Sequence, residues 1–444
     1  MPSARREHEE NLSKIVRDVE WEEDEASAGE LGDWSFSSQL PQTSDSLTII
    51  LNARTTKKNL DLLLSQNISD IDIVVNYDGR ISVPIVRALL ALCTPTASRW
   101  RSLSVQGVWD GDDRTSTVSD ELGEFMKQHR LSLPRLRELR LCNFYNEETI
   151  RVGTTDWVPS TTDFVGILPW EAPNLFALRS FQHVPPPSFP IADFSVFELY
   201  LVPLEDEIYS QVENLGSFLA SKQNVCDLIL KMDRIEFDAE EILHFPVSVF
   251  PAITSLQYHL LNVDTDIVRQ LYGPILKSMR IPNVQNYELS AELSSPTDVS
   301  AVLSFAPYLR LLLPDSRHHP LLTTVTIDIH FLADLEYLTS HEVRSTVIHI
   351  PLADIPYASS LRLKTFGQVF FSGKPGAGPS ALREVQFRSC SGMTIQGLRL
   401  AVYSLKIAGA WDLLERVVIR GCKLLDRDGA LEVIGEERLR FVEY

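Results

Sequence analysis

The chain has 444 residues, a hydrophobic fraction of 44% and a formal net charge of −19. The apolar fraction is ordinary for a folded protein and allows a continuous core. The negative charge disfavours nucleic acid and an anionic membrane surface as main partners, because both require a positively charged protein surface.

The five cysteines stand at positions 93, 142, 226, 390 and 422 and include no Cys-x-x-Cys pair. This spacing indicates buried thiols in a reducing compartment, with a reactive or metal-bound thiol as the alternative. The first residues lack the apolar stretch of a signal peptide, and the longest uncharged run, 245–263, contains two prolines. We therefore expect a cytoplasmic or nuclear protein that has no membrane partner.

Residues 1–45 are rich in Asp and Glu and poor in aliphatic side chains, which predicts a disordered acidic segment with a short helix near 12–19. Residues 46–444 alternate strand and helix patterns and are interpreted as one irregular repeat domain. Its predicted strands include 46–51, a segment within 59–76 that follows a helix, and 98–108. Its predicted helices include 84–93, 119–130 and 205–222.

Two stretches near the C-terminus, LREVQFRSCSGMTIQGL (382–398) and LERVVIRGCKLLDRDGAL (414–431), repeat one pattern. Apolar or small residues recur three, two and three positions apart, at Leu382, Val385, Phe387 and Cys390, and at Leu414, Val417, Ile419 and Cys422. The pattern predicts a strand, a polar turn and a helix that starts at Thr394 in one copy and at Asp426 in the other. Such a unit cannot bury its own apolar face, so it needs neighbours on both sides, as in a stacked repeat.

The same spacing of apolar residues recurs elsewhere in the chain, at irregular intervals. The closest are Leu136, Leu139, Leu141 and Phe144, and Leu439, Phe441 and Tyr444; looser ones lie near residues 175, 199, 228, 256, 325 and 347. Two amphipathic strand–helix units could also belong to any α/β protein, which is the alternative. The repetition favours an α/β leucine-rich-repeat solenoid, with a curved parallel sheet on its concave face and helices and irregular segments outside.

Residues 382–398 look like a cysteine-containing leucine-rich repeat, with Thr394, Gly397 and Leu398 at the helix start. In order, SLTIILNA, LLALCTPTASRWRSLSV, LPRLRELRL and APNLFALRSF are similar to the F-box/leucine-rich-repeat families of mushroom-forming fungi, over roughly residues 46–444. The resemblance implies a substrate receptor, whose repeats hold a target protein while an F-box docks on the Skp-type adaptor of a cullin-RING ubiquitin ligase. An F-box start of the form Leu-Pro-x-Glu is missing before Leu47, so the coupling to a ligase stays open, with an unconnected scaffold as the alternative.

Motifs of enzymes are weak. The GQVFFSGKPGAG stretch from Gly367 differs from a phosphate-binding loop in its glycine spacing and in having Pro375 at the Ser/Thr position. His341 and His349 are too far apart to share a helical metal site, His318 and His319 are adjacent, and no Gly-x-Ser-x-Gly motif is present. We expect no enzyme, cofactor or metal; a hydrolase with a scattered site is the remaining enzymatic alternative.

The partner-binding residues would be those that point away from the core on the strands. The repeat frame predicts them at Glu138, Arg140, Thr326, Asp328, Glu384, Gln386, Arg388, Arg416, Val418 and Arg420. Arg388 and Arg420 occupy the same slot in neighbouring repeats and would favour an acidic partner, unless Glu384, Glu415 and water balance them. The acidic residues 20–30 of the chain itself are one candidate for that partner, and deleting them should then increase binding of other proteins.

Overall fold

The computed structural model describes residues 46–51, 55–65, 68–77, 83–109, 131–145, 171–181, 184–185, 187, 193–202, 208–233, 242–263, 265–293, 308–331, 346–373 and 380–442. The chain divides into two compact units, Met1–Phe194 and Ser195–Tyr444. The predicted acidic segment 1–45 and the predicted helix 119–130 lie outside the described residues.

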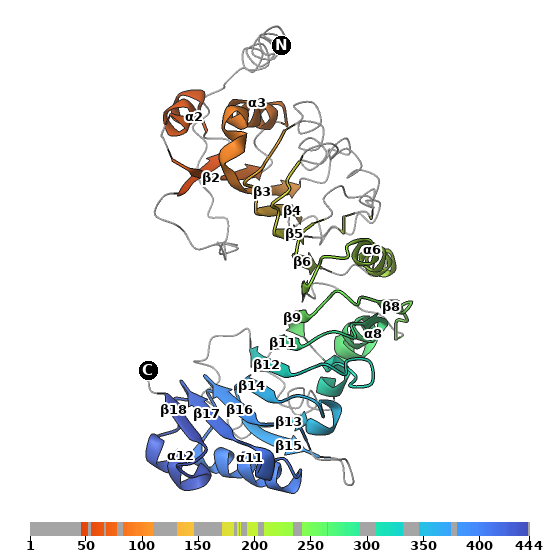
Figure 1. Ribbon diagram of the computed structural model, residues 1–444, viewed down its shortest axis with the longest axis vertical. Coiled ribbons are helices and arrows are strands. Elements are labelled where there is room, and N and C mark those ends of the chain that lie inside the picture. Colours follow the sequence, from red (N-terminus) through yellow and green to blue (C-terminus); the bar gives the residue numbers. More distant parts are fainter. Residues whose placement is uncertain are drawn as a thin grey trace. The chain divides into compact units, whose positions relative to one another are not determined.

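The N-terminal unit contains parallel strands that pair in chain order (Figure 1). They are β1 (Ser46–Leu51), β2 (Asp70–Tyr77), β3 (Trp100–Trp109), β4 (Glu138–Tyr145) and β5 (Ala177–Phe181). Its helical segments are α2 (Lys57–Leu64), α3 (Val83–Cys93) and the 3₁₀ turn η1 (Thr94–Arg99). Apolar residues at alternate positions of these strands are buried, including Ile73, Leu103 and Leu139, which stand opposite one another in the register.

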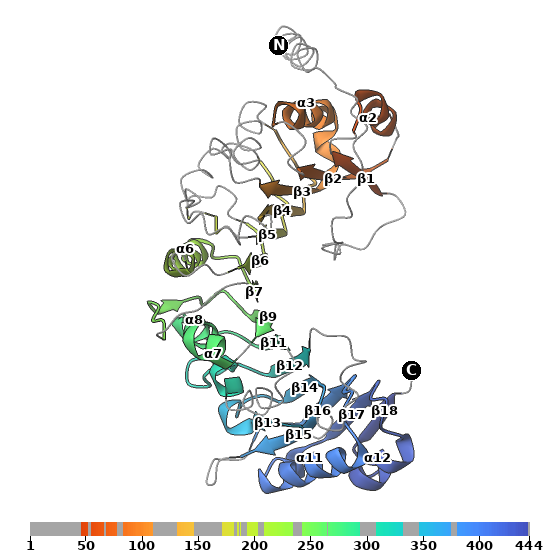
Figure 2. The same ribbon diagram turned by 180° about the vertical axis from the view of Figure 1, so that it is seen from behind.

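The main sheet of the C-terminal unit is also parallel, and its strands also follow chain order (Figure 2). They are β6 (Val196–Leu201), β7 (Asp227–Asp233), β9 (Ser255–Val263), β11 (Asn286–Leu293), β12 (Thr324–Phe331), β14 (Ser360–Thr365), β16 (Glu384–Arg388), β17 (Arg416–Arg420) and β18 (Leu439–Val442). Two smaller parallel sheets pair β8 (Ser248–Val249) with β10 (Met279–Arg280) and β13 (Val347–Pro351) with β15 (Gln368–Ser372).

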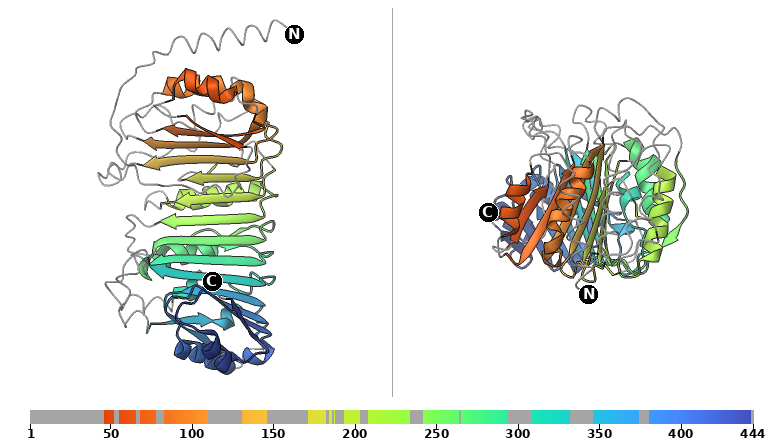
Figure 3. Two further views of the ribbon diagram at one scale, coloured as in Figure 1. Left: turned by 90° about the vertical axis from the view of Figure 1, so that its left-hand side faces the viewer. Right: turned by 90° about the horizontal axis from the view of Figure 1, so that it is seen from above.

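Helices lie along one face of this sheet in the C-terminal unit (Figure 3). They are α6 (Ile208–Ser221), α7 (Thr265–Ile267), the π-helical turn η3 (Val268–Tyr272), α8 (Gly273–Ser278), α11 (Ile395–Ile407) and α12 (Arg427–Ile434), with 3₁₀ turns η5 (Leu352–Asp354) and η6 (Trp411–Leu413). The ring centroids of Phe197 in β6 and Phe218 in α6 are 4.8 Å apart, and the Tyr258 hydroxyl in β9 donates to the Tyr272 carbonyl at 3.0 Å. The helices therefore cover the apolar face of the sheet.

Two rows of buried residues run across the sheet in register beneath these helices. One row is Phe197, Leu228, Leu256, Tyr287, Val325, Leu361, Val385, Val417 and Leu439, and the other is Leu199, Leu230, Tyr258, Leu289, Ile327, Leu363, Phe387, Ile419 and Phe441. Almost every one is fully buried, and only the last strand leaves its two members partly exposed. These rows form the core of the C-terminal unit.

In the C-terminal unit the same pair of backbone hydrogen bonds recurs at the start of β7, β9, β11, β12, β14, β16 and β17. Two consecutive amides, that of the residue just before a strand and that of the strand's first residue, donate to the same carbonyl. This carbonyl belongs to the residue just before the neighbouring strand, as when Thr323 and Thr324 donate to Gln285. The carbonyls that accept in this way belong to Ser195, Cys226, Thr254, Gln285, Thr323, Ser359 and Arg383. The number of residues from one such position to the next varies along the chain. It is 24 from β14 to β16 and 38 from Gln285 to Thr323. The repeat is regular in its hydrogen bonds and irregular in its length.

The predicted alignment of the two C-terminal stretches is confirmed. Val385 pairs with Val417 and Phe387 with Ile419, and the following helices begin where expected. The Thr394 hydroxyl accepts from the Gly397 amide at 3.2 Å, and an Asp426 carboxylate oxygen accepts from the Gly429 amide at 2.6 Å. Both residues are therefore helix N-caps.

The prediction that the stretch near Val347 forms a strand of the main sheet was wrong. The stretch near Val347 forms β13, which pairs with β15 outside the main sheet. The strand that follows β12 in the main sheet is β14, which the repeat frame missed. Both stretches place apolar residues two positions apart, Ile348 with Ile350 and Leu361 with Leu363, so this spacing alone does not distinguish them. The amides of Ser359 and Ser360, which donate to the Thr323 carbonyl, fix β14 in the sheet.

Candidate recognition surface

The strands of the C-terminal unit point every second side chain away from the apolar rows. We call the surface formed by these residues the polar face; it lies opposite the helices. Parallel register places equivalent residues side by side: Thr326 lies between Glu288 and Arg362, and Asp328 lies between Ser290 and Lys364. The polar face is therefore an ordered array of side chains about 4.8 Å apart from strand to strand.

Basic residues gather on the polar face over β14, β16, β17 and β18. We call this area the basic patch; its Lys and Arg residues are Arg362, Lys364, Arg388, Arg416, Arg420 and Arg440. Among the described residues of that face on these four strands, Glu384 is the one acidic side chain. Its carboxylate lies 3.2 Å from Arg416 Nε and also accepts a hydrogen bond from Gln386. The patch therefore carries an excess of positive charge.

Acidic residues dominate the polar face of β6 to β12 instead. They are Glu198, Asp227, Asp233, Glu288, Glu292 and Asp328, with Lys231 as the one cationic Lys or Arg among the described residues there. Lys231 Nζ lies 2.7 Å from Glu198 Oε1. At the border between the two areas, Lys364 Nζ donates to Asp328 Oδ2 at 2.8 Å. The prevailing charge of the polar-face residues therefore changes sign between β12 and β14, although Glu198 and Asp233 are themselves buried.

A histidine holds two of the acidic strands together. His330 Nε2 lies 3.4 Å from Glu292 Oε2, and its Nδ1 lies 3.2 Å from Asp328 Oδ1. The hydrogen bond to Asp328 raises the pKa of His330 above its usual 6.5, although burial opposes this. Burial acts to raise the pKa of Asp328 as well, but hydrogen bonds from His330 and Lys364 outweigh it and lower the pKa. The cluster is therefore most strongly held when His330 is protonated, and this stability is lost as the pH rises through the raised pKa.

A second histidine on the polar face predicts acid sensitivity. Burial, with a contribution from Lys231, lowers the pKa of His259 from 6.5 to about 4. Above pH 6.5 the ring is neutral in both the folded and the unfolded chain, so it does not change the free energy of unfolding with pH. Between pH 6.5 and 4 the unfolded chain binds a proton that the folded chain does not, so stability falls as the pH falls. At pH 5 this destabilises the C-terminal unit by about 2 kcal/mol.

We therefore expect His259→Gln to lose about 2 kcal/mol less stability than the wild type between pH 7 and pH 5. Urea unfolding followed by hydrogen exchange of peptides from β9 measures the difference at both pH values. All other titrating groups are shared by the two proteins, so their contributions cancel. Equal losses in the two proteins would contradict the buried neutral state of His259.

The predicted residues of the N-terminal unit are buried. Glu138 is 2% exposed and Arg140 is 7% exposed. One Glu138 carboxylate oxygen accepts from Arg140 Nε and from Arg179 Nε, each at 2.6 Å. Nearby, Arg101 pairs with the buried Asp72, because a register shift between β2 and β3 inserts Arg101 as an extra residue. These charged groups stabilise one another inside the unit.

The predicted residues of the C-terminal unit all lie on the polar face. Thr326, Asp328, Glu384 and Val418 are partly exposed, Gln386 is 9% exposed, and Arg388, Arg416 and Arg420 are exposed. Arg388 and Arg420 stand directly opposite each other, as the repeat frame predicted. Whether any of these residues contacts a partner stays a prediction.

Sequence reasoning missed Arg362, Lys364 and Arg440, which complete the basic patch. The first two belong to β14, the strand that the frame overlooked. The signal was present in SLRLKT, where Leu361 and Leu363 are both buried and the residues between them are basic. A search for the strand pattern alone, without the cysteine that follows it in later repeats, would have found this strand.

The cysteines whose side chains the structure describes are unpaired thiols. Cys390 and Cys422 occupy equivalent buried positions, and their sulfur atoms lie 3.4 Å from the Leu363 carbonyl and 3.6 Å from the Phe387 carbonyl. Burial raises the pKa of Cys93 to about 12, which suppresses its thiolate. No group of three or more His, Cys, Asp or Glu side chains that could hold a metal ion occurs among the described residues.

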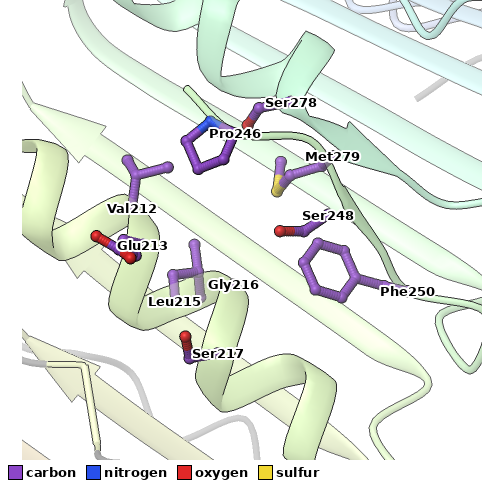
Figure 4. Close-up of a pocket in the computed structure, with 10 residues that line it drawn as sticks. All are labelled: Val212, Glu213, Leu215, Gly216, Ser217, Pro246, Ser248, Phe250, Ser278 and Met279. Atoms are coloured by element: carbon purple, nitrogen blue, oxygen red, sulfur yellow. The ribbon is translucent and has the colours of Figure 1, made fainter. Parts of the chain in front are cut away.

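A small cavity of about 200 Å³ lies on the helix side, between α6 and the strands β8 and β10 (Figure 4). Its walls are apolar side chains such as Leu215, Phe250 and Met279, together with the hydroxyls of Ser217, Ser248 and Ser278. Glu213 is the one charged residue among those that line it.

The described residues of the weak motifs lie on separate elements. His349 lies on β13, and its ring packs in a tilted arrangement against Phe370 of β15, with centroids 5.1 Å apart. His319 is buried and its Nδ1 contacts the Asp315 carbonyl at 2.8 Å. His341 and most of the segment around Pro375 lie outside the described residues.

In comparisons with known proteins, no family model and no curated protein matched this chain. Among the described helices, none combines the length and the apolar character that crossing a membrane requires.

Proposed function

We propose that the chain is a leucine-rich-repeat solenoid that serves as a non-enzymatic protein–protein recognition module. The observation that carries the proposal is the in-register polar face of β6 to β18, which presents rows of charged side chains on parallel strands. Helices lie along the opposite face (Figure 3), and the side chains of the polar face on β9, β11 and β12 are partly exposed or exposed, whereas Glu198 and Asp233 on β6 and β7 are buried. Repeat proteins use such surfaces for binding, and their specificity depends on individual side chains.

The repeated entry hydrogen bonds and the N-capped helices after β16 and β17 support the leucine-rich-repeat interpretation. The resemblance to F-box receptors adds a more specific proposal, in which the polar face holds the substrate of a ubiquitin ligase. A scaffold that has no connection to a ligase is the alternative, and both would use the same surface.

The test compares two variants that add the same charge to opposite faces. Thr326→Arg with Val418→Arg places bulky cations on the polar face, and Tyr403→Arg with Ile407→Arg places them on exposed positions of α11. Tagged full chains are purified with their bound proteins, which are quantified by mass spectrometry. We expect bound partners to fall at least tenfold for the polar-face variant and to stay unchanged for the α11 variant.

Two further results of this experiment matter. Equal recovery with all three chains would contradict the proposal, provided that their thermal unfolding midpoints agree within a few degrees. The presence of the Skp-type adaptor among the recovered proteins would support the ligase receptor, and its absence alongside other polar-face partners would support the scaffold.

A further inference from the structure

One row of the polar face has unsatisfied polar groups at its centre. The row crosses β9, β11, β12, β14 and β16 through residues that stand opposite one another, namely Gln257, Glu288, Thr326, Arg362 and Gln386. Its two ends are held, because Gln257 Oε1 lies 3.3 Å from His259 Nε2 and Gln386 Oε1 accepts from Arg388 Nε at 2.9 Å. We call Glu288, Thr326 and Arg362 the central row; their side chains form no hydrogen bond or ion pair with any residue that the structure describes.

Arg362 carries a donor that folding leaves unused. Its Nε is buried and has no hydrogen-bond partner, although the side chain as a whole is partly exposed. A buried N–H without an acceptor is destabilising, and nearly all such groups in folded proteins are paired. The side chain is long, so a change of rotamer that brings the guanidinium to a partner's oxygen would satisfy this donor. Lys364 on the same strand already donates to Asp328 at 2.8 Å, so Arg362 is the strand's available cation.

Glu288 places an acceptor at the other end of the central row. It lies two strands from Arg362, about 10 Å away at the usual strand spacing, with Thr326 between them. Burial, with the neighbouring Asp328, raises the pKa of Glu288, and the charge of Arg362 acts in the opposite direction. The carboxylate and the guanidinium therefore influence each other across Thr326 without forming a contact.

This order of charges selects the chemistry of a ligand. A carboxylate approaching Arg362 would be repelled by Glu288 and Asp328, and an ammonium group approaching Glu288 would be repelled by Arg362. A carboxamide has no net charge, and it offers an acceptor oxygen for a guanidinium together with an NH₂ donor for a carboxylate. Both hydrogen bonds would involve a charged group and would be stronger than bonds between neutral groups. Thr326 has the shortest side chain of the three, so a partner's side chain can approach the sheet most closely there.

We propose that the central row binds an Asn or Gln side chain of a partner protein. The carboxamide oxygen accepts from Arg362, the carboxamide NH₂ donates to Glu288, and Thr326 lies beneath the group. This inference rests on the proposed function and assigns the chemistry of one contact on the polar face.

The test selects binders of the full chain from a random library of seven-residue peptides displayed on phage, with the Arg362→Met chain used to remove unrelated binders. We expect the enriched peptides to share Asn or Gln at one position. Enrichment of Asp or Glu would identify a simple anion site, enrichment of Lys or Arg a simple cation site, and the absence of a shared residue a contact with peptide backbone. Each of these three results would overturn the proposal.

Synthetic copies of the selected peptide are then measured by fluorescence anisotropy. Glu288→Met and Arg362→Met should each weaken binding about tenfold, and the double variant about a hundredfold, since each removes one charge-assisted hydrogen bond. Replacement of the peptide's Asn or Gln by Asp or Glu should also cost about tenfold. The matched control is Arg399→Met, which removes an exposed arginine from α11 and should change the affinity less than threefold. Equal affinities for wild type and double variant would contradict the proposed contact.

Thermal unfolding of Arg362→Met separates ligand binding from a role in folding. Methionine is long and has no N–H, so the variant loses the unsatisfied donor and should unfold at the same temperature as the wild type or at a higher one. A midpoint lowered by more than a few degrees would assign Arg362 to the fold and refute its role as a ligand-binding group.

This outcome is separable from that of the proposed function. If partners captured from cells depend on Thr326 and Val418 but bind normally to the Glu288 and Arg362 variants, the recognition module stands and the carboxamide contact does not. Circular dichroism of all variants checks that each remains folded, since every substituted side chain is exposed or partly exposed.

Discussion

Glu138→Ala is expected to lower the free energy of unfolding of the N-terminal unit by about 3 to 5 kcal/mol. Glu138 is 2% exposed, and its carboxylate pairs with two guanidinium groups, those of Arg140 and Arg179, through contacts of 2.6 Å. Alanine removes this charge and leaves both cations close together within the buried part of the sheet. The loss of a buried charge partner costs more than the intact pair contributes, which is why the effect is large.

Native-state hydrogen exchange of peptides from β4 and β5 measures this loss within the unit concerned. Arg140→Ala should cost less, because Glu138 then still pairs with Arg179. Removal of the exposed pair between Arg399 and Glu432 serves as the control and should change stability by less than about 1 kcal/mol. A loss below 1 kcal/mol for Glu138→Ala would show that water or other groups already compensate these charges.

Phe387→Ala is expected to destabilise the C-terminal unit by about 3 to 5 kcal/mol. Phe387 is 1% exposed and stands in the buried row between Leu363 and Ile419. Alanine removes the ring from a position that is enclosed by two strands and their helices, so a cavity remains and contacts on both sides are lost.

The neighbouring substitution Arg388→Ala is the control, because that side chain points to the polar face and is exposed. It should change stability by about 0.5 kcal/mol or less. Hydrogen exchange should show lost protection in β14, β16 and β17 after Phe387→Ala, with little change in the N-terminal unit. Full retention of protection in β16 would contradict the assignment of Phe387 to the core.

The strands could be predicted where the apolar frame is complete. Val385 with Phe387, and Val417 with Ile419, share spacing, a following cysteine and an N-cap, so several independent signals agree on one register. The stretches that form β13 and β14 lack these additional signals. Their assignment depends on which carbonyl the preceding amides reach, and alternation in the sequence does not encode that contact.

The candidate surface was less predictable than the strands. Alternation correctly put Glu138 and Arg388 on the side away from the apolar rows, but one is buried and the other is exposed. Burial depends on which other segments cover that part of the sheet, and no local pattern reports it. The excess of positive charge could not be seen either, because it required β14 to be recognised as a strand of the same sheet.

The hydrogen bonds at the strand entries have a consequence for how such a chain can change over evolution. The strands β7 to β17 of the main sheet are aligned by amides that donate to the residue just before the neighbouring strand, whether 24 or 38 residues separate the two positions. Residues can therefore be inserted or deleted between strands without shifting the alignment of the side chains on either face. The connecting segments are free to diversify in length while the spacing of the charges that a ligand would meet is preserved.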